Sequence, residues 1–182
     1  MAKFKHSRLW GGIMINRNIW FTSDTHFGHS KIIEYCHRPF KNVHEMDMEI
    51  IRRWNSKIKK RDLVFHLGDF SLCGKDYATR IVSQLNGEIR LIKGNHDRHG
   101  EQWFRDIGIA KVYDYPIVFE DFIVLSHEPM PFIPSAGMIN LHGHIHDSLM
   151  YETWGNRCAC MCVERHDYYP VHIKEIAKHY SG

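Results

Sequence analysis

The chain has 182 residues, of which 43% are hydrophobic and 25% charged, and its formal net charge is +3. This balance is that of a folded globular protein and excludes disordered and collagen-like chains, while the length suits one domain. The net charge is too small to indicate binding to nucleic acid. The unusual count is that of histidine, with 15 residues against five cysteines.

No apolar run reaches the roughly 18 to 20 residues that a membrane-spanning helix needs. The apolar stretch at residues 9–15 is broken by two glycines and is not typical of a signal peptide. The alternating cysteines Cys158, Cys160 and Cys162 fit reduced thiols on one face of a strand. We therefore expect a cytoplasmic protein without membrane contact. Residues 1–13 are interpreted as an N-terminal extension and residues 14–182 as a single domain.

The first half of the chain alternates predicted strands and helices. The strands are the apolar runs Ile19 to Thr22, Leu63 to Leu67 and Glu88 to Ile92. Asn42, with Glu45 three residues later, predicts the start of a helix whose apolar residues recur every four positions from Met46 to Ile58. A second helix is predicted from an N-cap at Asp76 to Gly87, a glycine placed to end it in the left-handed conformation.

The second half is richer in strands, with a short helical stretch near Trp103 and a closing helix at Ile173 to His179. The predicted strands are Val112 to Tyr115, Ile117 to Phe119, Phe122 to Leu125, Met138 to Leu141 and Cys158 to Val163. Continuous apolar runs in the first half favour parallel strands that are buried on both faces. The pattern as a whole predicts an α/β fold.

Each of several predicted strands ends in residues that can bind metal. These residues are Asp24, His26, Asp69, Asn95, His96, Asp97, His127, His144 and His146. In α/β sheets, ligands bind outside the carboxyl ends of the strands, so we expect these clusters to converge in one site. Gly68, Gly94 and Gly143 precede three of the clusters, at points where the chain turns sharply and its backbone comes close to bound ions.

These clusters, in this order, resemble the signature of the calcineurin-like metallophosphoesterases, in particular of small bacterial and phage members. The matching blocks are Asp24-Thr25-His26, Gly68-Asp69, Gly94-Asn95-His96-Asp97, His127 and Gly143-His144-Ile145-His146. One departure is Leu72, because many members carry an acidic residue at that position. The resemblance implies a metallophosphoesterase-type four-layer α/β/β/α sandwich, in which two mixed sheets are flanked by helices.

The resemblance further implies a site with two divalent metal ions. Asp24, His26 and His146 would hold the first metal, Asn95, His127 and His144 the second, and Asp69 would bridge both. Carboxylate, amide and imidazole ligands suit Mn, Fe, Zn, Ni or Co, and we expect manganese first. Two ions roughly 3.5 to 4 Å apart can deprotonate a bridging water and hold the phosphate oxygens while hydroxide attacks phosphorus.

Four further residues receive predicted roles in the reaction. His96 is the candidate general acid for the leaving group, and Asp97 is expected to orient it through a hydrogen bond. His29 and Arg38 are candidates for contacts with the substrate, although an exposed loop histidine and a surface ion pair are the alternatives. His66 and His142 lie beside the blocks and are expected to support the site rather than bind metal.

The predicted function is hydrolysis of a phosphodiester or a phosphomonoester. A nuclease acting on DNA or RNA is the alternative within enzymes, and the weak positive charge disfavours it. A non-catalytic scaffold with the same fold is the alternative from another class, and it predicts the loss of ligands or of the acid. The sequence leaves the oligomeric state open.

Overall fold

The computed structural model describes residues 17–130, 137–148 and 157–180. The extension predicted for residues 1–13 lies outside these ranges. Among the described residues no helix has the length and apolar character needed to cross a membrane. All five cysteines lie among the described residues, and none of them forms a disulfide there.

The larger sheet has the strand order β4-β3-β2-β1-β9. Its strands are β1 (Ile19–Thr22), β2 (Leu63–His66), β3 (Glu88–Ile92), β4 (Lys111–Tyr113) and β9 (Val171–His172). Strands β1 to β4 run parallel, as predicted for the first half of the chain, and β9 pairs antiparallel with β1. The parallel strands therefore bring the chain segments that follow β1, β2 and β3 to one edge of the sheet.

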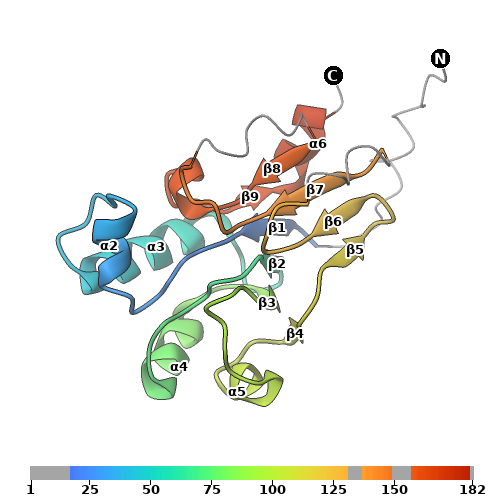
Figure 1. Ribbon diagram of the computed structural model, residues 1–182. Coiled ribbons are helices and arrows are strands. Elements are labelled where there is room, and N and C mark those ends of the chain that lie inside the picture. Colours follow the sequence, from blue (N-terminus) through green and yellow to red (C-terminus); the bar gives the residue numbers. More distant parts are fainter. Residues whose placement is uncertain (1–16, 131–136, 149–156, 181–182) are drawn as a thin grey trace.

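The smaller sheet has the order β5-β6-β7-β8. Its strands are β5 (Ile117–Phe119), β6 (Ile123–Leu125), β7 (Ile139–His142) and β8 (Cys158–Cys160). β5 is antiparallel to β6, whereas β6, β7 and β8 run parallel. Figure 1 shows this sheet on one side of the larger sheet and the helices α3, α4 and α5 on the other. The predicted fold class, two mixed sheets flanked by helices, is confirmed.

The helices largely follow the sequence pattern. They are α2 (Lys31–Tyr35), α3 (Val43–Lys57), α4 (Lys75–Gln84), α5 (Glu101–Asp106) and α6 (Ile173–Tyr180), with a 3-10 turn at Val163–His166. The side chain of Asn42 caps α3 by accepting a hydrogen bond from the Glu45 amide, as predicted. The predicted cap of α4 is wrong: Gly74 is its N-cap, and Asp76 lies in the first turn, where its charge favours the helix dipole.

The other end of α4 also differs from the prediction. Helix α4 ends at Gln84, and its C-cap Leu85 is extended. Gly87 does adopt the left-handed conformation, with φ of +97°, but it does so in the turn that leads into β3. Its role is therefore to reverse the chain rather than to end the helix.

Two apolar cores hold the strands in place. Val64 and Ile89 point toward the helices and pack with Trp54 and Ile81. The alternate residues of the same sheet, such as Phe65, pack with Leu125 and Leu141 of the smaller sheet. Full burial of each large apolar side chain stabilises the fold by about 1.5 to 3 kcal/mol. The strand ends that carry polar residues are thus fixed from both faces.

Candidate metal centre

The seven predicted metal ligands all follow strand ends, and the structure brings them together. Asp24 follows β1, Asp69 follows β2, Asn95 follows β3, His127 follows β6, and His144 follows β7. The loops are joined by main-chain hydrogen bonds, since the Asp24 amide donates to Gly68 and the His26 amide to the Asp69 carbonyl. Side chains distant in sequence therefore converge at the carboxyl edge of both sheets.

The first group of ligand atoms comes from Asp24, His26 and His146. Oδ1 of Asp24 lies 3.8 Å from Nε2 of His26 and 3.7 Å from Nε2 of His146. Oδ2 of Asp69 lies 3.6 Å from the same nitrogen of His26. These are the four residues predicted for the first metal and the bridge.

The second group comes from Asn95, His127 and His144. Oδ1 of Asn95 lies 3.0 Å from Nε2 of His127 and 3.1 Å from Nδ1 of His144. Nε2 of His127 lies 3.6 Å from Oδ2 of Asp69. A single carboxylate oxygen of Asp69 thus faces both groups.

The chemistry of these atoms fits bound cations. Oδ1 of Asp24 and Nε2 of His26 are buried and have no hydrogen-bond partner among the described residues, a costly state for polar atoms unless something else satisfies them. Nitrogen and oxygen ligands about 2.1 Å from one ion lie roughly 3 to 3.5 Å from one another, close to the separations in both groups. The residues therefore suit two ions that share Asp69.

The surrounding hydrogen bonds decide which atoms face the site. Oδ2 of Asp24 accepts from the Ser23 hydroxyl at 2.5 Å and from the His144 amide at 2.9 Å, which leaves Oδ1 free. Nδ1 of His127 lies 2.8 Å from the Leu67 carbonyl, so this nitrogen carries the proton and Nε2 presents its lone pair. The backbone thereby orients both types of ligand.

The electrostatic surroundings favour the protonation state that binds metal at two of these positions. Burial opposes ionisation of Asp24, but neighbouring histidines led by His127 outweigh it, and the pKa of Asp24 is lowered to about 2. Burial lowers the pKa of His26 to about 2. An ionised carboxylate and a neutral imidazole are the forms that bind metal.

Five of the seven ligands have left-handed backbones. Their φ angles are 57° at Asp24, 50° at His26, 56° at Asp69, 71° at His144 and 49° at His146. Such conformations cost about 1 to 3 kcal/mol at a non-glycine residue and concentrate at functional sites. The fold therefore sustains backbone strain at the positions that supply the ligands.

The three glycines of the blocks make room for the side chains of the predicted ligands. A Cβ atom on Gly143 would lie 2.3 Å from Oδ2 of Asp24, and one on Gly94 would lie 2.2 Å from Oδ1 of Asp69. At Gly68, φ is +101° and a Cβ atom would lie 2.4 Å from Nδ1 of His127. Only at Gly68 does the backbone conformation itself also favour glycine.

His96 faces the first group, but its predicted partner does not orient it. The rings of His96 and His26 are 5.6 Å apart, and the His96 amide donates to Oδ1 of Asp69 at 2.9 Å. The expected hydrogen bond between the His96 ring and Asp97 is wrong. The Asp97 carboxylate is buried beneath the site and accepts from the amides of Asp69, Phe70 and Gly94.

Asp97 therefore acts on the shape of the loops. Its three main-chain partners join the loop after β2 to the loop after β3, which carry Asp69 and Asn95. Burial outweighs these hydrogen bonds and raises the pKa of Asp97 to about 6. Asp97 therefore holds together the two loops that carry the predicted ligands Asp69 and Asn95, and it does not orient the His96 ring.

Of the two predicted substrate contacts, the structure supports only His29 as a candidate. The half-buried ring of His29 lies 5.6 Å from the His26 ring. Arg38 is wrong as a substrate contact, because its side chain is fully buried. Its guanidinium donates to the carbonyls of Asp24 and Thr25 and to the Glu164 carboxylate, so it supports the first metal loop from behind.

Glu164 is a site residue that the sequence patterns do not reveal. It lies in the 3-10 turn after β8 and accepts a hydrogen bond from Nδ1 of His146 at 3.0 Å. Although burial acts in the opposite direction, contacts with Cys36 and Glu164 raise the pKa of His146 to about 11, so a cation that binds this ring must displace a proton from it. A carboxylate behind a metal-binding histidine fixes the ring and increases its basicity as a ligand.

His66 and His142 lie behind the ligands, in line with their predicted supporting positions. Nε2 of His66 is 3.0 Å from the hydroxyl of Thr25, the residue between the predicted ligands Asp24 and His26. Nδ1 of His142 is 2.9 Å from the Gly143 carbonyl. Neither contributes to the two groups of ligand atoms described above.

Comparison with known proteins assigns the chain to a family. The family model described as "Calcineurin-like phosphoesterase" matches residues 17–170. An uncharacterized protein of Methanocaldococcus jannaschii is 36% identical over 145 residues, which cover 70% of this chain and 82% of the relative. The Gene 66 protein of Mycobacterium phage D29 is 29% identical over 169 residues, covering 76% and 83% of the two chains.

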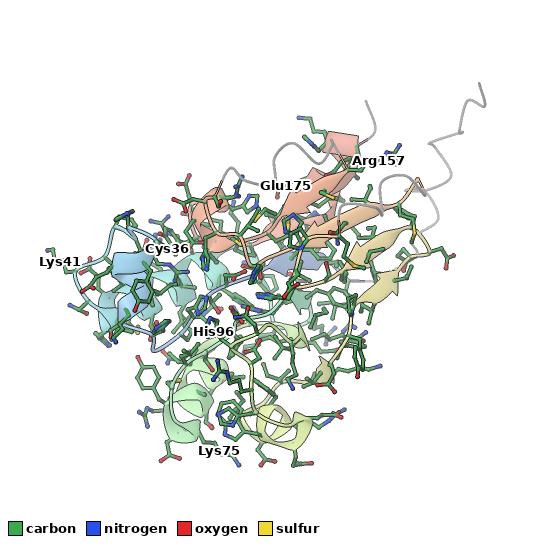
Figure 2. The ribbon with its side chains drawn as sticks, viewed as in Figure 1. Cys36, Lys41, Lys75, His96, Arg157 and Glu175 are labelled. Atoms are coloured by element: carbon green, nitrogen blue, oxygen red, sulfur yellow. The ribbon has the colours of Figure 1, made fainter. Side chains whose placement is uncertain are left out.

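The fold also matches a solved structure. A protein of unknown function from Aquifex aeolicus has a TM-score of 0.74 and 27% sequence identity, and the match covers 90% of this chain and 99% of that chain. Figure 2 shows His96 near the middle of the molecule, among nitrogen- and oxygen-bearing side chains.

Proposed function

Because the chain belongs to the calcineurin-like phosphoesterase family, we propose that it is a hydrolase that cleaves a phosphate ester with the aid of two divalent metal ions. The observation that carries the proposal is the sharing of Oδ2 of Asp69, which lies 3.6 Å from both His26 Nε2 and His127 Nε2. A carboxylate oxygen between two groups of nitrogen and oxygen donors suits two neighbouring cations. The nitrogen and oxygen donors suit Mn, Fe, Zn, Ni or Co equally, and manganese is our first expectation among them.

Bound cations would supply Lewis acidity that polarises the phosphate and lowers the pKa of water. The protein contributes the arrangement of donors. Asp24 and Asp69 offer negative charge, while the neutral Asn95 and the histidines complete the two groups without excess charge. His96 lies beside the first group and donates a proton to the leaving oxygen, a role that typically contributes about 10² to 10⁴ in rate.

The intact donor set supports an enzyme over a non-catalytic scaffold. A scaffold has no need to keep buried, unsatisfied ligand atoms such as Oδ1 of Asp24 or strained backbone at five ligand positions. The nuclease alternative gains no support from the formal net charge of +3, because nucleic-acid affinity depends mainly on contacts with phosphates.

The test is an assay of purified protein that has been stripped of metal and then supplied with Mn²⁺. Turnover of bis(p-nitrophenyl) phosphate or p-nitrophenyl phosphate should require added metal, and calorimetry should detect two binding events per chain. If two ions bind and neither ester is hydrolysed, the proposed activity is wrong.

A further inference from the structure

Two separate cavities open beside the metal-binding groups. One cavity contains the candidate acid His96, and we call it the acid-side pocket. It has a volume of about 640 Å³, and its walls include Leu72, His96, Arg98 and His99. The strand-side pocket has a volume of about 440 Å³. Its walls include Asn95, Tyr115, Pro116, His127, Pro129 and Met130.

Each pocket adjoins a different half of the donor cluster. The acid-side pocket contains His96, whose ring lies 5.6 Å from that of His26 in the first group. The strand-side pocket contains Asn95 and His127, whose ligand atoms lie 3.0 Å apart in the second group. The consecutive residues Asn95 and His96 thus line different cavities, and a phosphate held between the two groups would have space for an organic group in each direction.

The walls of the acid-side pocket suit a planar group. The ring of His99 stacks on Trp103 with centroids 4.1 Å apart and an interplanar angle of 12°. Leu72 is 37% exposed and adds apolar surface, while the exposed Arg98 adds a cation. Aromatic and guanidinium faces both favour stacking with planar rings.

The strand-side pocket combines aromatic and apolar side chains with the acidic side chains of Asp114 and Glu128. Tyr115 is 79% exposed and stands beside Pro116, Pro129 and Met130. The lysine of this pocket, Lys93, pairs with Asp114 at 3.0 Å. The lining therefore offers contacts for an uncharged organic group more than it offers a site for a second phosphate.

We propose that the preferred substrate is a phosphodiester with an organic group on each side of the phosphorus, one for each pocket. This inference rests on the proposed function. The leaving group occupies the acid-side pocket, and the retained group occupies the strand-side pocket. The oxygen of water forms the new bond to phosphorus, and the bond from phosphorus to the leaving oxygen breaks. His96 supplies the proton of the product alcohol and is reprotonated by the proton that the attacking water releases, and the other product is a phosphomonoester.

The two pockets predict different effects on two model esters. p-Nitrophenyl phosphate has only a leaving group, whereas bis(p-nitrophenyl) phosphate has a leaving and a retained group. We expect kcat/KM to be at least about 10-fold higher for the diester, since an aromatic group in a matching pocket contributes roughly this factor. Tyr115→Ala should lower the ratio of diester to monoester kcat/KM about 10-fold, whereas His99→Ala should lower both values and preserve the ratio. Val118→Ala, an exposed position on β5, serves as the control that changes neither.

Binding provides a second readout that needs no turnover. Dibenzylphosphinate and benzyl(methyl)phosphinate carry the same single negative charge but have two aromatic arms and one, respectively. Both contain carbon in place of the scissile oxygen, so the enzyme cannot hydrolyse them. Calorimetry on the manganese-loaded enzyme should show tighter binding of the two-armed compound, and Tyr115→Ala should remove that advantage. Because Tyr115 is largely exposed, this variant is expected to fold normally.

The outcomes separate this inference from the proposed function. If neither ester is hydrolysed, the proposed function fails. If esters are hydrolysed but the monoester is preferred, or the ratio does not respond to Tyr115→Ala, the phosphodiester inference is overturned while the hydrolase stands. Equal affinity for the one-armed and two-armed compounds would also overturn it.

Discussion

The carboxylate of Glu164 accepts a hydrogen bond from Nδ1 of His146 at 3.0 Å, while Nε2 of the same ring faces Asp24. We expect Glu164→Gln to weaken metal binding about 10- to 100-fold, because the ring loses its orienting carboxylate. Calorimetric titration of stripped protein with Mn²⁺ measures this change. The control is Glu34→Gln, at an exposed position of α2, and equal affinities for the two variants would contradict the role of Glu164.

Arg38 supports the fold rather than the substrate. Its buried guanidinium pairs with Glu164 at 2.6 Å, and removal of one partner of a buried pair typically costs about 3 to 5 kcal/mol. Arg38→Ala should therefore lower the free energy of unfolding by this amount even without metal or substrate. Urea denaturation in a chelator measures the loss. Arg52→Ala, which breaks an exposed pair, should cost only about 0.5 kcal/mol, and similar losses for both would refute the assignment.

The convergence of the seven predicted ligands could be expected from the sequence, because each lies in the loop that follows a strand. Asp24 and Asp69 follow β1 and β2, so the order of the parallel strands alone brings them together. Glu164 could not be predicted in this way, since it reaches His146 from a 3-10 turn that β8 positions. Nothing in the local spacing distinguishes it from an ordinary surface glutamate.

The direction in which side chains point within the loops could not be predicted from the sequence either. Asp97 is adjacent to His96, but the turn after β3 directs its carboxylate to backbone amides. Arg38 is a loop residue whose exposure depends on the packing of α3 and the 3-10 turn. The two-residue strand β9 is too short to produce a periodic pattern. Strand ends could therefore be predicted, whereas contacts made by single polar side chains could not.

Gly143 should be required for metal binding for steric reasons. A Cβ atom there would lie 2.0 Å from the Ser23 hydroxyl and 2.3 Å from Oδ2 of Asp24. Gly143→Ala is therefore expected to displace Asp24 and to weaken binding of the first metal at least about 10-fold. Gly100→Ala is the matched control, because a Cβ atom there meets nothing within 4 Å. Normal metal content in the Gly143 variant would show that the loop can adjust.

Variants of His96 and Asp69 should distinguish loss of catalysis from loss of metal binding. His96→Ala removes the proton donor but none of the predicted ligands, so metal content should persist while kcat falls by about 10² to 10⁴. Asp69→Asn removes the shared carboxylate and should lose metal and activity together. Elemental analysis and ester turnover on the same samples provide the measurement. If both variants were metal-free, the acid role of His96 would lose its support.

Asp47 lies in α3, outside the candidate metal centre, and makes the stability of the protein depend on pH. It is buried in α3 and accepts hydrogen bonds from the Gly28 amide at 3.0 Å and the Tyr77 hydroxyl at 2.8 Å. Burial outweighs these bonds and raises the pKa of Asp47 from 3.8 to about 6. The native state therefore keeps a proton that the unfolded chain releases between these values. The resulting stabilisation is complete below pH 3.8 and is lost as pH rises through about 6.

Replacement of Asp47 by Asn removes this proton equilibrium. The difference in unfolding free energy between wild type and Asp47→Asn should shift by about 3 kcal/mol from below pH 4 to pH 7, with the wild type losing stability relative to the variant. Urea denaturation across this range, with a chelator to exclude metal binding, measures the shift. Asp121→Asn, at an exposed turn between β5 and β6, is the control, and its pH profile should follow that of the wild type. Parallel pH profiles for wild type and Asp47→Asn would mean that burial does not control the Asp47 carboxyl.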